Sequence, residues 1–241
     1  MKLSKGLKIT YLGHSTFRLE LGNGKRIIID PWLQGNPVCP ESEKKIDQLD
    51  LILVTHGHFD HLGDTASLMG GTQARLIAIP EICAYVGKQG VGEDRMLSMN
   101  KGGTLPLPDL GIKVTMTNAF HSGGIMDPGG ILYGGEPSGY VIEFEDGFRL
   151  YHAGDTCVFG DMKIIGELYK PDVAMLPIGD RYTMSPREAA YAIRLLGVKC
   201  VIPMHFATFP LLTGTPEMLR DEAKDVAGLE VVALKPGETA S

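Results

Sequence analysis

The segment LILVTHGHFDH, residues Leu51–His61, decides how the rest of the chain is interpreted. Its first part, Leu51–Thr55, is an almost continuous apolar run of the kind found in strands that are buried on both faces. Three histidines and an aspartate follow it directly, and such a group of polar side chains serves no packing purpose. The segment therefore predicts a buried strand that delivers metal-binding side chains to the carboxyl end of a sheet.

The spacing of these polar residues fits a pair of metal ions. If the backbone stays extended, His56 and His58 project from the same side of the chain and can bind one cation together. Asp60 and His61 follow where the chain turns toward a helix, and they can bind a second cation nearby. Two metal ions about 3.5–4 Å apart lower the pKa of a bridging water and stabilise a developing oxyanion. The donor set suits zinc, and also iron, manganese or cobalt.

Further candidate ligands lie outside this segment. His121, Asp155 and His205 each stand at or just beyond the predicted end of a strand. All three can therefore converge on one edge of the fold. A carboxylate such as that of Asp155 can bridge two metal ions.

The remainder of the chain alternates short apolar runs with turns rich in Gly and Pro. Hairpins early in the chain, followed by strand–helix alternation, predict an α/β fold of two mixed β-sheets flanked by helices, in one domain over residues 1–241. Strands are expected at Lys8–Leu12, Phe17–Leu21, Arg26–Asp30, Leu51–Thr55, Ala74–Ile79, Lys113–Thr117, Tyr140–Glu145, Phe148–His152, Val173–Leu176, Val201–Met204 and Leu229–Leu234.

The helices are expected between these strands. The clearest is Pro186–Leu196, because Ser185 and Glu188 form a capping-box pattern before it and Gly197 follows it. The other expected helices are Leu62–Met69, Glu81–Lys88, Asp161–Tyr169 and one from Pro216 to about Val226.

The composition excludes several classes of protein. The chain has 241 residues, 44% of them hydrophobic, which is enough for a core without disulfides and rules out a disordered chain. Its net charge of −6 argues against nucleic acid as a partner, since phosphate binding needs clustered Lys and Arg. The aliphatic runs are far too short to span a membrane, and no apolar signal core follows the N-terminus. We therefore expect a cytoplasmic protein with neither nucleic acid nor a membrane as a partner.

The polar pattern as a whole resembles the metallo-β-lactamase superfamily, whose motif is H-x-H-x-D-H, then a His, an Asp and a final His. All seven positions match in this order. The resemblance implies two groups of metal ligands joined by a bridging aspartate: His56, His58 and His121 for one ion, Asp60, His61 and His205 for the other, and Asp155 between them. It also implies a four-layer αβ/βα sandwich with the site at one edge of the two sheets.

Three shorter stretches suggest a narrower resemblance: GHST at 13–16, IDPW at 29–32 and GEPSG at 135–139. Together they are similar to the branch of the superfamily that contains ascorbate-6-phosphate lactonase and relatives of N-acyl-phosphatidylethanolamine phospholipase D. Within that branch the chain most resembles small metal-dependent hydrolases. Asp30 resembles the superfamily aspartate that orients a ligand histidine, with a turn-forming role before Pro31 as the alternative.

The roles of His14 and of the glycine-rich stretch Ser122–Pro137 are less defined. His14 can orient a site residue or contact substrate, which makes it a candidate catalytic residue together with Asp60, or it can be a hydrogen-bonded turn histidine. His152 lies within a strand and is expected to be structural. The stretch Ser122–Pro137 directly follows His121 and is expected to shape the substrate pocket, with a plain surface loop as the alternative.

The leading functional prediction is a metal-dependent hydrolase. Two divalent metal ions, zinc first and manganese or iron as alternatives, would hold a bridging hydroxide that attacks an ester, lactone or related bond of a small-molecule substrate. Asp60 or a metal-bound water would transfer protons, so no Ser or Cys nucleophile is needed. Two alternatives stay open: a compact phosphodiesterase or nuclease of the same fold, and a metal-binding sensor without catalysis. The sequence does not determine the substrate, the metal, or whether the chain forms a homo-oligomer.

Overall fold

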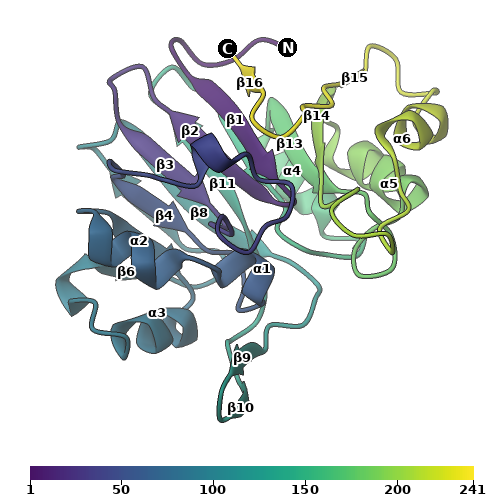
Figure 1. The fold of residues 1–241 in the computed structure, drawn as a ribbon. Coiled ribbons are helices and arrows are strands. Elements are labelled where there is room, and N and C mark those ends of the chain that lie inside the picture. The colour runs from purple at the N-terminus through teal and green to yellow at the C-terminus, as the bar shows by residue number, and fades with distance from the viewer.

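The computed structural model describes all 241 residues and places most of them in or around two seven-stranded sheets (Figure 1). The first sheet, in spatial order, consists of β16 (Thr239–Ala240), β1 (Lys8–Gly13), β2 (Thr16–Glu20), β3 (Arg26–Ile29), β4 (Leu51–Leu53), β5 (Arg75–Ala78) and β6 (Met96–Ser98). The second consists of β15 (Glu230–Val231), β14 (Cys200–Met204), β13 (Val173–Pro177), β12 (Arg149–His152), β11 (Ser138–Phe144), β8 (Ile112–Asn118) and β7 (Thr104–Leu107).

Helices cover the outer sides of the two sheets (Figure 1). Beside the first sheet lie α2 (Thr65–Gly71) and α3 (Pro80–Gly87), and beside the second lie α4 (Met162–Tyr169), α5 (Pro186–Leu196) and α6 (Pro216–Glu222). A single turn of helix, α1 (Phe59–Leu62), and two 3₁₀ turns, Glu41–Glu43 and Glu93–Arg95, complete the helical segments. The expected four-layer sandwich of two mixed sheets flanked by helices is confirmed.

Strand direction brings several loops to one edge of the molecule. In each sheet the hairpin strands are antiparallel, whereas β3 to β6 and β12 to β15 are parallel. Because β8 and β12 are both antiparallel to β11, they also run in the same direction as each other. The carboxyl ends of β4, β8, β12 and β14 are the points after which the seven predicted metal ligands follow, as expected for a site at the ends of parallel strands.

Hydrogen bonds join the two sheets where the HGHFDH motif begins. The Tyr140 hydroxyl in β11 donates to the Val54 carbonyl just after β4, at 2.7 Å. The Ser138 backbone N–H and its hydroxyl both donate to the Thr55 carbonyl, each at 3.0 Å. All four residues are buried, so these bonds satisfy carbonyl groups that water cannot reach. They fix the start of the motif against the second sheet.

The expected helix over residues 62–69 is wrong in its boundaries, because the structure has two short helices there. Gly63 separates α1 from α2 and has φ +31°, a conformation that other residues adopt rarely. A Cβ atom at this position would lie 2.5 Å from the Pro31 carbonyl oxygen. The break places Asp60 and His61 within α1, directly against the strand ends. By contrast, α5 has the expected bounds, with the capping box of Ser185 and Glu188 present.

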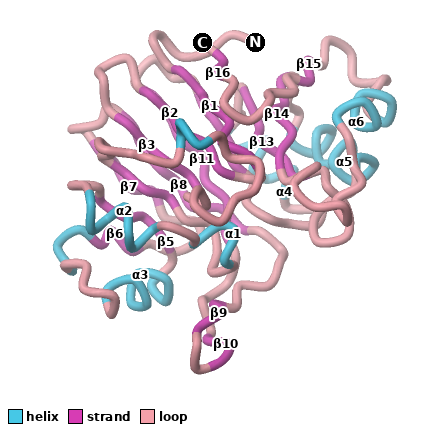
Figure 2. Tube along the Cα trace, viewed as in Figure 1, coloured by secondary structure: helices cyan, strands magenta, loops and turns pink.

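Several short strands do not follow from the sequence pattern. The strands β6 and β7 are only partly buried and therefore lack a continuous apolar run. The two-residue strand β16 pairs with β1 at the edge of the first sheet, a contact between the two ends of the chain. Within Ser122–Pro137, β9 (Ile125–Asp127) and β10 (Gly130–Leu132) form a separate hairpin that extends away from the sheets (Figure 2).

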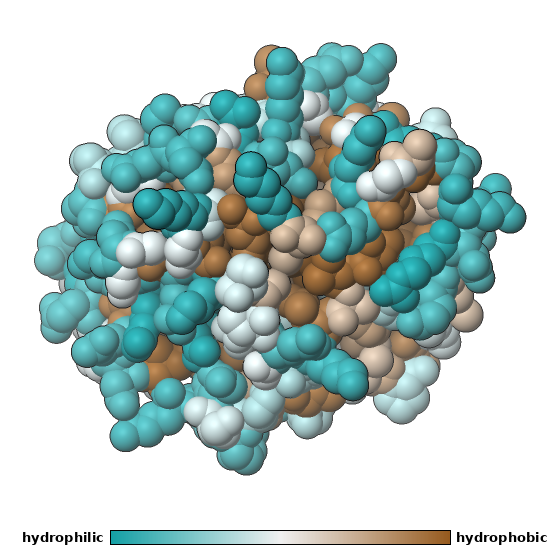
Figure 3. Space-filling view, turned by 90° about the horizontal axis from the view of Figure 1, so that it is seen from above, coloured by the Kyte–Doolittle hydropathy of each residue, from teal (hydrophilic) through white to brown (hydrophobic).

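The surface differs in character from the interior. Hydrophilic side chains cover most of the end of the molecule where both chain termini lie, with apolar areas between them (Figure 3). None of the helices combines the length and apolar character that a membrane crossing requires.

Replacing Tyr140 by Phe tests the bond between the sheets. We expect Tyr140→Phe to lower the free energy of unfolding by about 1–3 kcal/mol, because it leaves the buried Val54 carbonyl short of a donor. Denaturation in urea, followed by circular dichroism, measures the change. Tyr151→Phe is the matched control, since the buried Tyr151 hydroxyl makes no hydrogen bond to the first sheet and has only the Thr117 hydroxyl of its own sheet nearby, so its removal is expected to cost less. Equal losses in the two variants would contradict the role given to Tyr140.

Candidate metal centre

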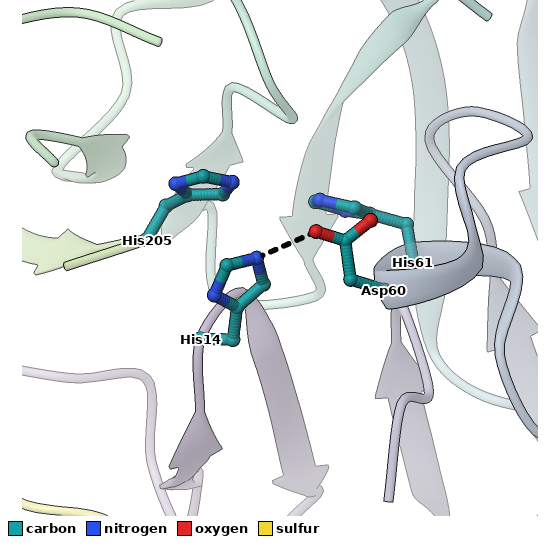
Figure 4. A group of neighbouring side chains, drawn as sticks. All are labelled: His14, Asp60, His61 and His205. Carbon is teal, nitrogen blue, oxygen red and sulfur yellow. Dashed lines mark hydrogen bonds and ion pairs between the residues drawn. The ribbon is translucent and has the colours of Figure 1, made fainter. Parts of the chain in front are cut away.

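The structure brings all seven predicted ligands together at the edge described above. Together with His14, these residues form three groups whose ligand atoms lie within 4.8 Å of one another. The first is His56, His58 and His121, the second is His56, His61 and Asp155, and the third is His14, Asp60, His61 and His205. The first and third groups share no residue, and Asp155 contacts members of both. The residues that the sequence-based prediction assigns to separate ions thus lie in separate groups, while the group of His56, His61 and Asp155 links them. The third group includes one residue outside the seven, His14 (Figure 4).

Asp155 lies between the histidines of both groups. Its Oδ2 atom is 3.0 Å from His205 Nε2, 3.2 Å from His61 Nε2 and 3.6 Å from His121 Nε2. Its Oδ1 atom is buried and has no hydrogen-bond partner. A carboxylate that is 2% exposed thus has three imidazole nitrogens directed at one of its oxygens.

In the first group, neighbouring hydroxyls occupy the outer nitrogens of two rings. His56 Nε2 lies 2.9 Å from His58 Nδ1, so these two atoms are directed at the same point. The other nitrogen of His56 is 3.0 Å from the Thr55 hydroxyl, and that of His58 is 3.2 Å from the Ser122 hydroxyl. Each ring therefore keeps one nitrogen for a shared cation while the other is held by a hydroxyl, the usual arrangement for metal-binding histidines.

Gly57, between these two histidines, has no room for a side chain. A Cβ atom there would lie 2.8 Å from the Gly123 carbonyl oxygen and 2.6 Å from Ile125 Cγ1. The base of the β9–β10 hairpin therefore packs directly on the backbone of the motif. Of the stretch expected to shape the pocket, Ser122 contacts a site histidine, whereas Ile131 in the hairpin and Tyr133 directly after it are exposed.

Asp30 contacts His61 at Nδ1, the ring nitrogen opposite the one that faces Asp155. Its Oδ1 atom accepts the Thr55 backbone N–H at 2.7 Å, and its Oδ2 atom accepts the Thr55 hydroxyl at 2.7 Å and lies 2.7 Å from His61 Nδ1. Asp30 is fully buried, so these contacts compensate its loss of hydration. The expected contact between Asp30 and a histidine of the cluster is present. Thr55 is a residue that the sequence reasoning missed as a partner, and its only signal was its position next to His56.

Three residues of the site have left-handed backbone conformations that side chains rarely adopt. The φ angles of His14, Asp30 and His205 are +59°, +49° and +55°. Such conformations cost about 1–3 kcal/mol each and persist where surrounding contacts hold them, often at functional sites. Here one contact is a hydrogen bond from the His205 N–H to the His14 carbonyl, at 2.7 Å.

The directions of their pKa shifts divide the site histidines into two kinds. Burial lowers the pKa of His56 well below its usual range, with the nearby His61 adding to the effect, and burial lowers the pKa of His121 to about 4. Both rings are therefore neutral and able to bind a cation at pH 7. Burial acts the same way on His61, but the carboxylates of Asp155 and Asp30 outweigh it and raise its pKa well above the usual range. In turn, His205 and His61 outweigh burial and hold the pKa of Asp155 well below its usual range.

The residues fit a divalent metal ion. The Nε2 atom of His61, the Oδ1 atom of Asp155 and the Nδ1 atom of His205 are buried without a hydrogen-bond partner. An imidazole nitrogen faces a carboxylate oxygen favourably only when a proton or a metal cation lies between them. Histidine nitrogen and carboxylate oxygen are also the donors that zinc and related ions bind.

His152 differs from the other histidines. Its Nε2 atom lies 3.2 Å from the Ser15 carbonyl and its Nδ1 atom accepts the Gly154 N–H at 3.1 Å. Both ring nitrogens are thus occupied by backbone groups, as expected for a structural residue.

A sequence model of the β-lactamase superfamily domain matches residues 25–206, a range that contains all seven predicted ligands. The chain belongs to this superfamily. Within it, the chain belongs to the family of UPF0173 metal-dependent hydrolases. The relative from Rubrobacter xylanophilus is 54% identical over 235 residues, covering 97% of this chain and 96% of the relative. The relative from Methanopyrus kandleri is 46% identical over 234 residues, covering 97% of this chain and 99% of the relative.

Solved structures share the fold. Igni18, a metallo hydrolase from Ignicoccus hospitalis, superposes with a TM-score of 0.85 at 36% identity, covering 97% of both chains. An isothiocyanate hydrolase from Delia radicum gut bacteria has a TM-score of 0.73 at 19% identity, covering 97% of this chain and 98% of that one. The narrower resemblance to the ascorbate-6-phosphate lactonase branch stays a prediction.

Replacing Asp30 by Asn tests whether it supports the metal centre. We expect Asp30→Asn to weaken metal binding about 10–100-fold, because an amide has one acceptor oxygen and cannot accept both the Thr55 N–H at one terminal atom and the Thr55 hydroxyl and His61 at the other. Competition with a chromophoric chelator measures the affinity. The control is Asp64→Asn, since Asp64 accepts the backbone N–H groups of Leu33 and Gln34 and contacts no histidine. Metal affinity in Asp30→Asn within about twofold of the wild type would contradict the supporting role.

Proposed function

We propose that this protein hydrolyses an ester, lactone or related bond of a small molecule with two divalent metal ions, zinc being the expected one. The observation that carries the proposal is the buried carboxylate of Asp155 with three histidine Nε2 atoms around one of its oxygens. In this proposal His56, His58 and His121 hold one ion, Asp60, His61 and His205 hold the other, and Asp155 lies between them. When bound, such ions supply a bridging hydroxide at neutral pH and polarise the oxygen that gains charge in the transition state.

Asp60 is the candidate for proton exchange in this proposal, and it is ionised at neutral pH. Burial raises its pKa, but the hydrogen bond from His14 and the nearby His61 outweigh burial and lower the pKa to about 2. The carboxylate is therefore ionised at neutral pH, which suits a metal ligand, and it accepts a proton from a nucleophile only transiently because its pKa lies far below pH 7. One of its oxygens is engaged by His14, which leaves the other for an ion or a proton.

The surroundings of the centre favour a substrate with an apolar part. Phe59 and Phe120, each next to a ligand in sequence, are 57% and 54% exposed. Phe59 also packs against Trp32, with ring centroids 5.6 Å apart. No Lys or Arg side chain makes a hydrogen bond or ion pair with any of the seven ligands, and the chain carries a net charge of −6. A phosphodiester stays the second candidate substrate, because two metal ions can themselves stabilise its charge.

Elemental analysis and a substrate panel test the proposal. We expect close to two metal ions per chain, and turnover of lactones or esters that stops after treatment with a chelator and returns when metal is restored. The panel includes thioesters and phosphodiesters with each of zinc, manganese and iron. Turnover of phosphodiesters alone would replace the proposal by a phosphodiesterase. A loaded protein that turns over no member of the panel would favour a metal-binding sensor.

A pair of variants separates metal chemistry from cysteine chemistry. We expect Asp155→Ala to lose metal and to lower the rate more than about 100-fold, because the ions lose the ligand between them. Cys157→Ala is expected to keep both metal and rate, since Cys157 is an exposed free thiol. Rates come from the best substrate of the panel, and metal content from elemental analysis of the same samples. Normal turnover by a metal-free Asp155→Ala protein would refute the mechanism.

A further inference from the structure

His14 lies outside the seven-residue pattern and outside residues 25–206, yet it contacts the centre. It occupies the turn between β1 and β2 and is fully buried. Its Nε2 atom is 3.0 Å from Asp60 Oδ2, and its Nδ1 atom is 2.9 Å from the Thr208 hydroxyl. Figure 4 shows the ring between Asp60 and His205, with the hydrogen bond to Asp60 marked.

The backbone of His14 reaches a second ligand. The His14 carbonyl accepts the His205 N–H at 2.7 Å and the Tyr11 hydroxyl at 3.0 Å. The imidazole rings of His14 and His205 are also close, with centroids 4.0 Å apart. One residue thus contacts two members of the same ligand group, Asp60 through its side chain and His205 through its backbone.

The hydrogen bonds of Thr208 decide which nitrogen of His14 carries the proton. The Asp60 carboxylate only accepts, so its 3.0 Å contact with His14 Nε2 requires a hydrogen on that nitrogen, and a neutral imidazole then accepts at Nδ1. The Thr208 hydroxyl lies 2.9 Å from His14 Nδ1 and 3.4 Å from the Phe206 carbonyl oxygen. The shorter distance favours donation of its hydrogen to His14 Nδ1. Nε2 then carries the hydrogen and donates it to Asp60. A protonated nitrogen has no lone pair for a metal ion, so His14 acts through Asp60 and does not bind the ion itself.

We propose that His14 is a positioning residue for the ligand group of Asp60, His61 and His205. The Nε2–H group holds the Asp60 carboxylate in one orientation, and the carbonyl holds the backbone of His205 in its left-handed conformation. Asp60 comes from α1 and His205 from the end of β14, so a third element is needed to fix one relative to the other. The inference rests on the proposed function, because it assumes that this group binds an ion.

Metal titrations of His14 variants test the inference. We expect His14→Leu to weaken metal binding by the group of Asp60, His61 and His205 about 10–100-fold. Metal affinity of the group of His56, His58 and His121 should be unchanged. His14→Gln should keep the ion of the Asp60, His61 and His205 group, the second ion, since the Gln amide N–H can donate to Asp60 in place of Nε2–H. Thr208→Val should cause a smaller loss than His14→Leu. His152→Gln is the control, a buried histidine whose ring nitrogens meet only backbone groups.

The cobalt-loaded proteins supply a second measurement. The visible spectrum of bound Co²⁺ reports its ligands, so His14→Gln should leave the spectrum of the second ion unchanged. Circular dichroism and urea denaturation of the metal-free proteins show whether each variant is folded. The inference is overturned if a folded His14→Leu protein binds two ions as tightly as the wild type. It is also overturned if His14→Gln alters the spectrum and loses the ion as fully as His14→Leu, because His14 is then a direct ligand.

Failure of the proposed function gives a different result in the same titration. A wild-type protein that binds fewer than two ions contradicts the centre with two ions, and the role of His14 with it. A wild type with two ions and unaffected His14 variants contradicts the role of His14 alone.

Discussion

A carboxylate buried away from water needs hydrogen-bond donors or a cation around it, and Asp30 and Asp155 meet this requirement in different ways. Asp30 is surrounded by protein groups: the Thr55 N–H, the Thr55 hydroxyl and His61 Nδ1. Asp155 has one oxygen with no partner and the other facing imidazole nitrogens. Both oxygens of the first carboxylate therefore have partners within the protein, whereas the second carboxylate keeps one oxygen free for a cation. This difference distinguishes the supporting part of the centre from the part that binds metal.

The packing of the two sheets places these two carboxylates close together. Asp30 follows β3 in the first sheet and Asp155 follows β12 in the second. The hydrogen bonds of Tyr140 and Ser138 to the carbonyls of Val54 and Thr55 hold the two sheets together at that level. Because these groups are buried, the sheets cannot shift without leaving polar atoms unpaired.

The left-handed conformations of His14, Asp30 and His205 have a common cause. Each of these residues directs a side chain or a carbonyl into the centre from a sharp turn at or just beyond the end of a strand, and an extended backbone would carry the chain past it. Buried hydrogen bonds at each position offset the conformational cost. Hydrolytic chemistry benefits from such preorganisation, since the ligands then need no rearrangement when charge develops.

The sequence by itself determined the features that depend on neighbours along the chain. The buried strand before His56, the alternation that directs His56 and His58 to one side, and the capping box of α5 all involve contacts within a few residues. The motif order also identified His121, Asp155 and His205, through a family resemblance. The sequence could not show which groups surround each ligand. It left the role of His14 open, missed Thr55 as a partner of Asp30, and extended one helix through Gly63.

Only the tertiary structure decided these points, because each depends on residues far apart in the chain. Gly63 ends α1 where the Pro31 carbonyl leaves no room for a side chain. His14 contacts Asp60 and Thr208, which are 46 and 194 positions away. The short strands β6, β7 and β16 form because neighbouring strands offer free backbone groups, and their own side chains carry no strong pattern. Local preference selects the elements and the ligand types, whereas packing of the two sheets decides what each ligand meets.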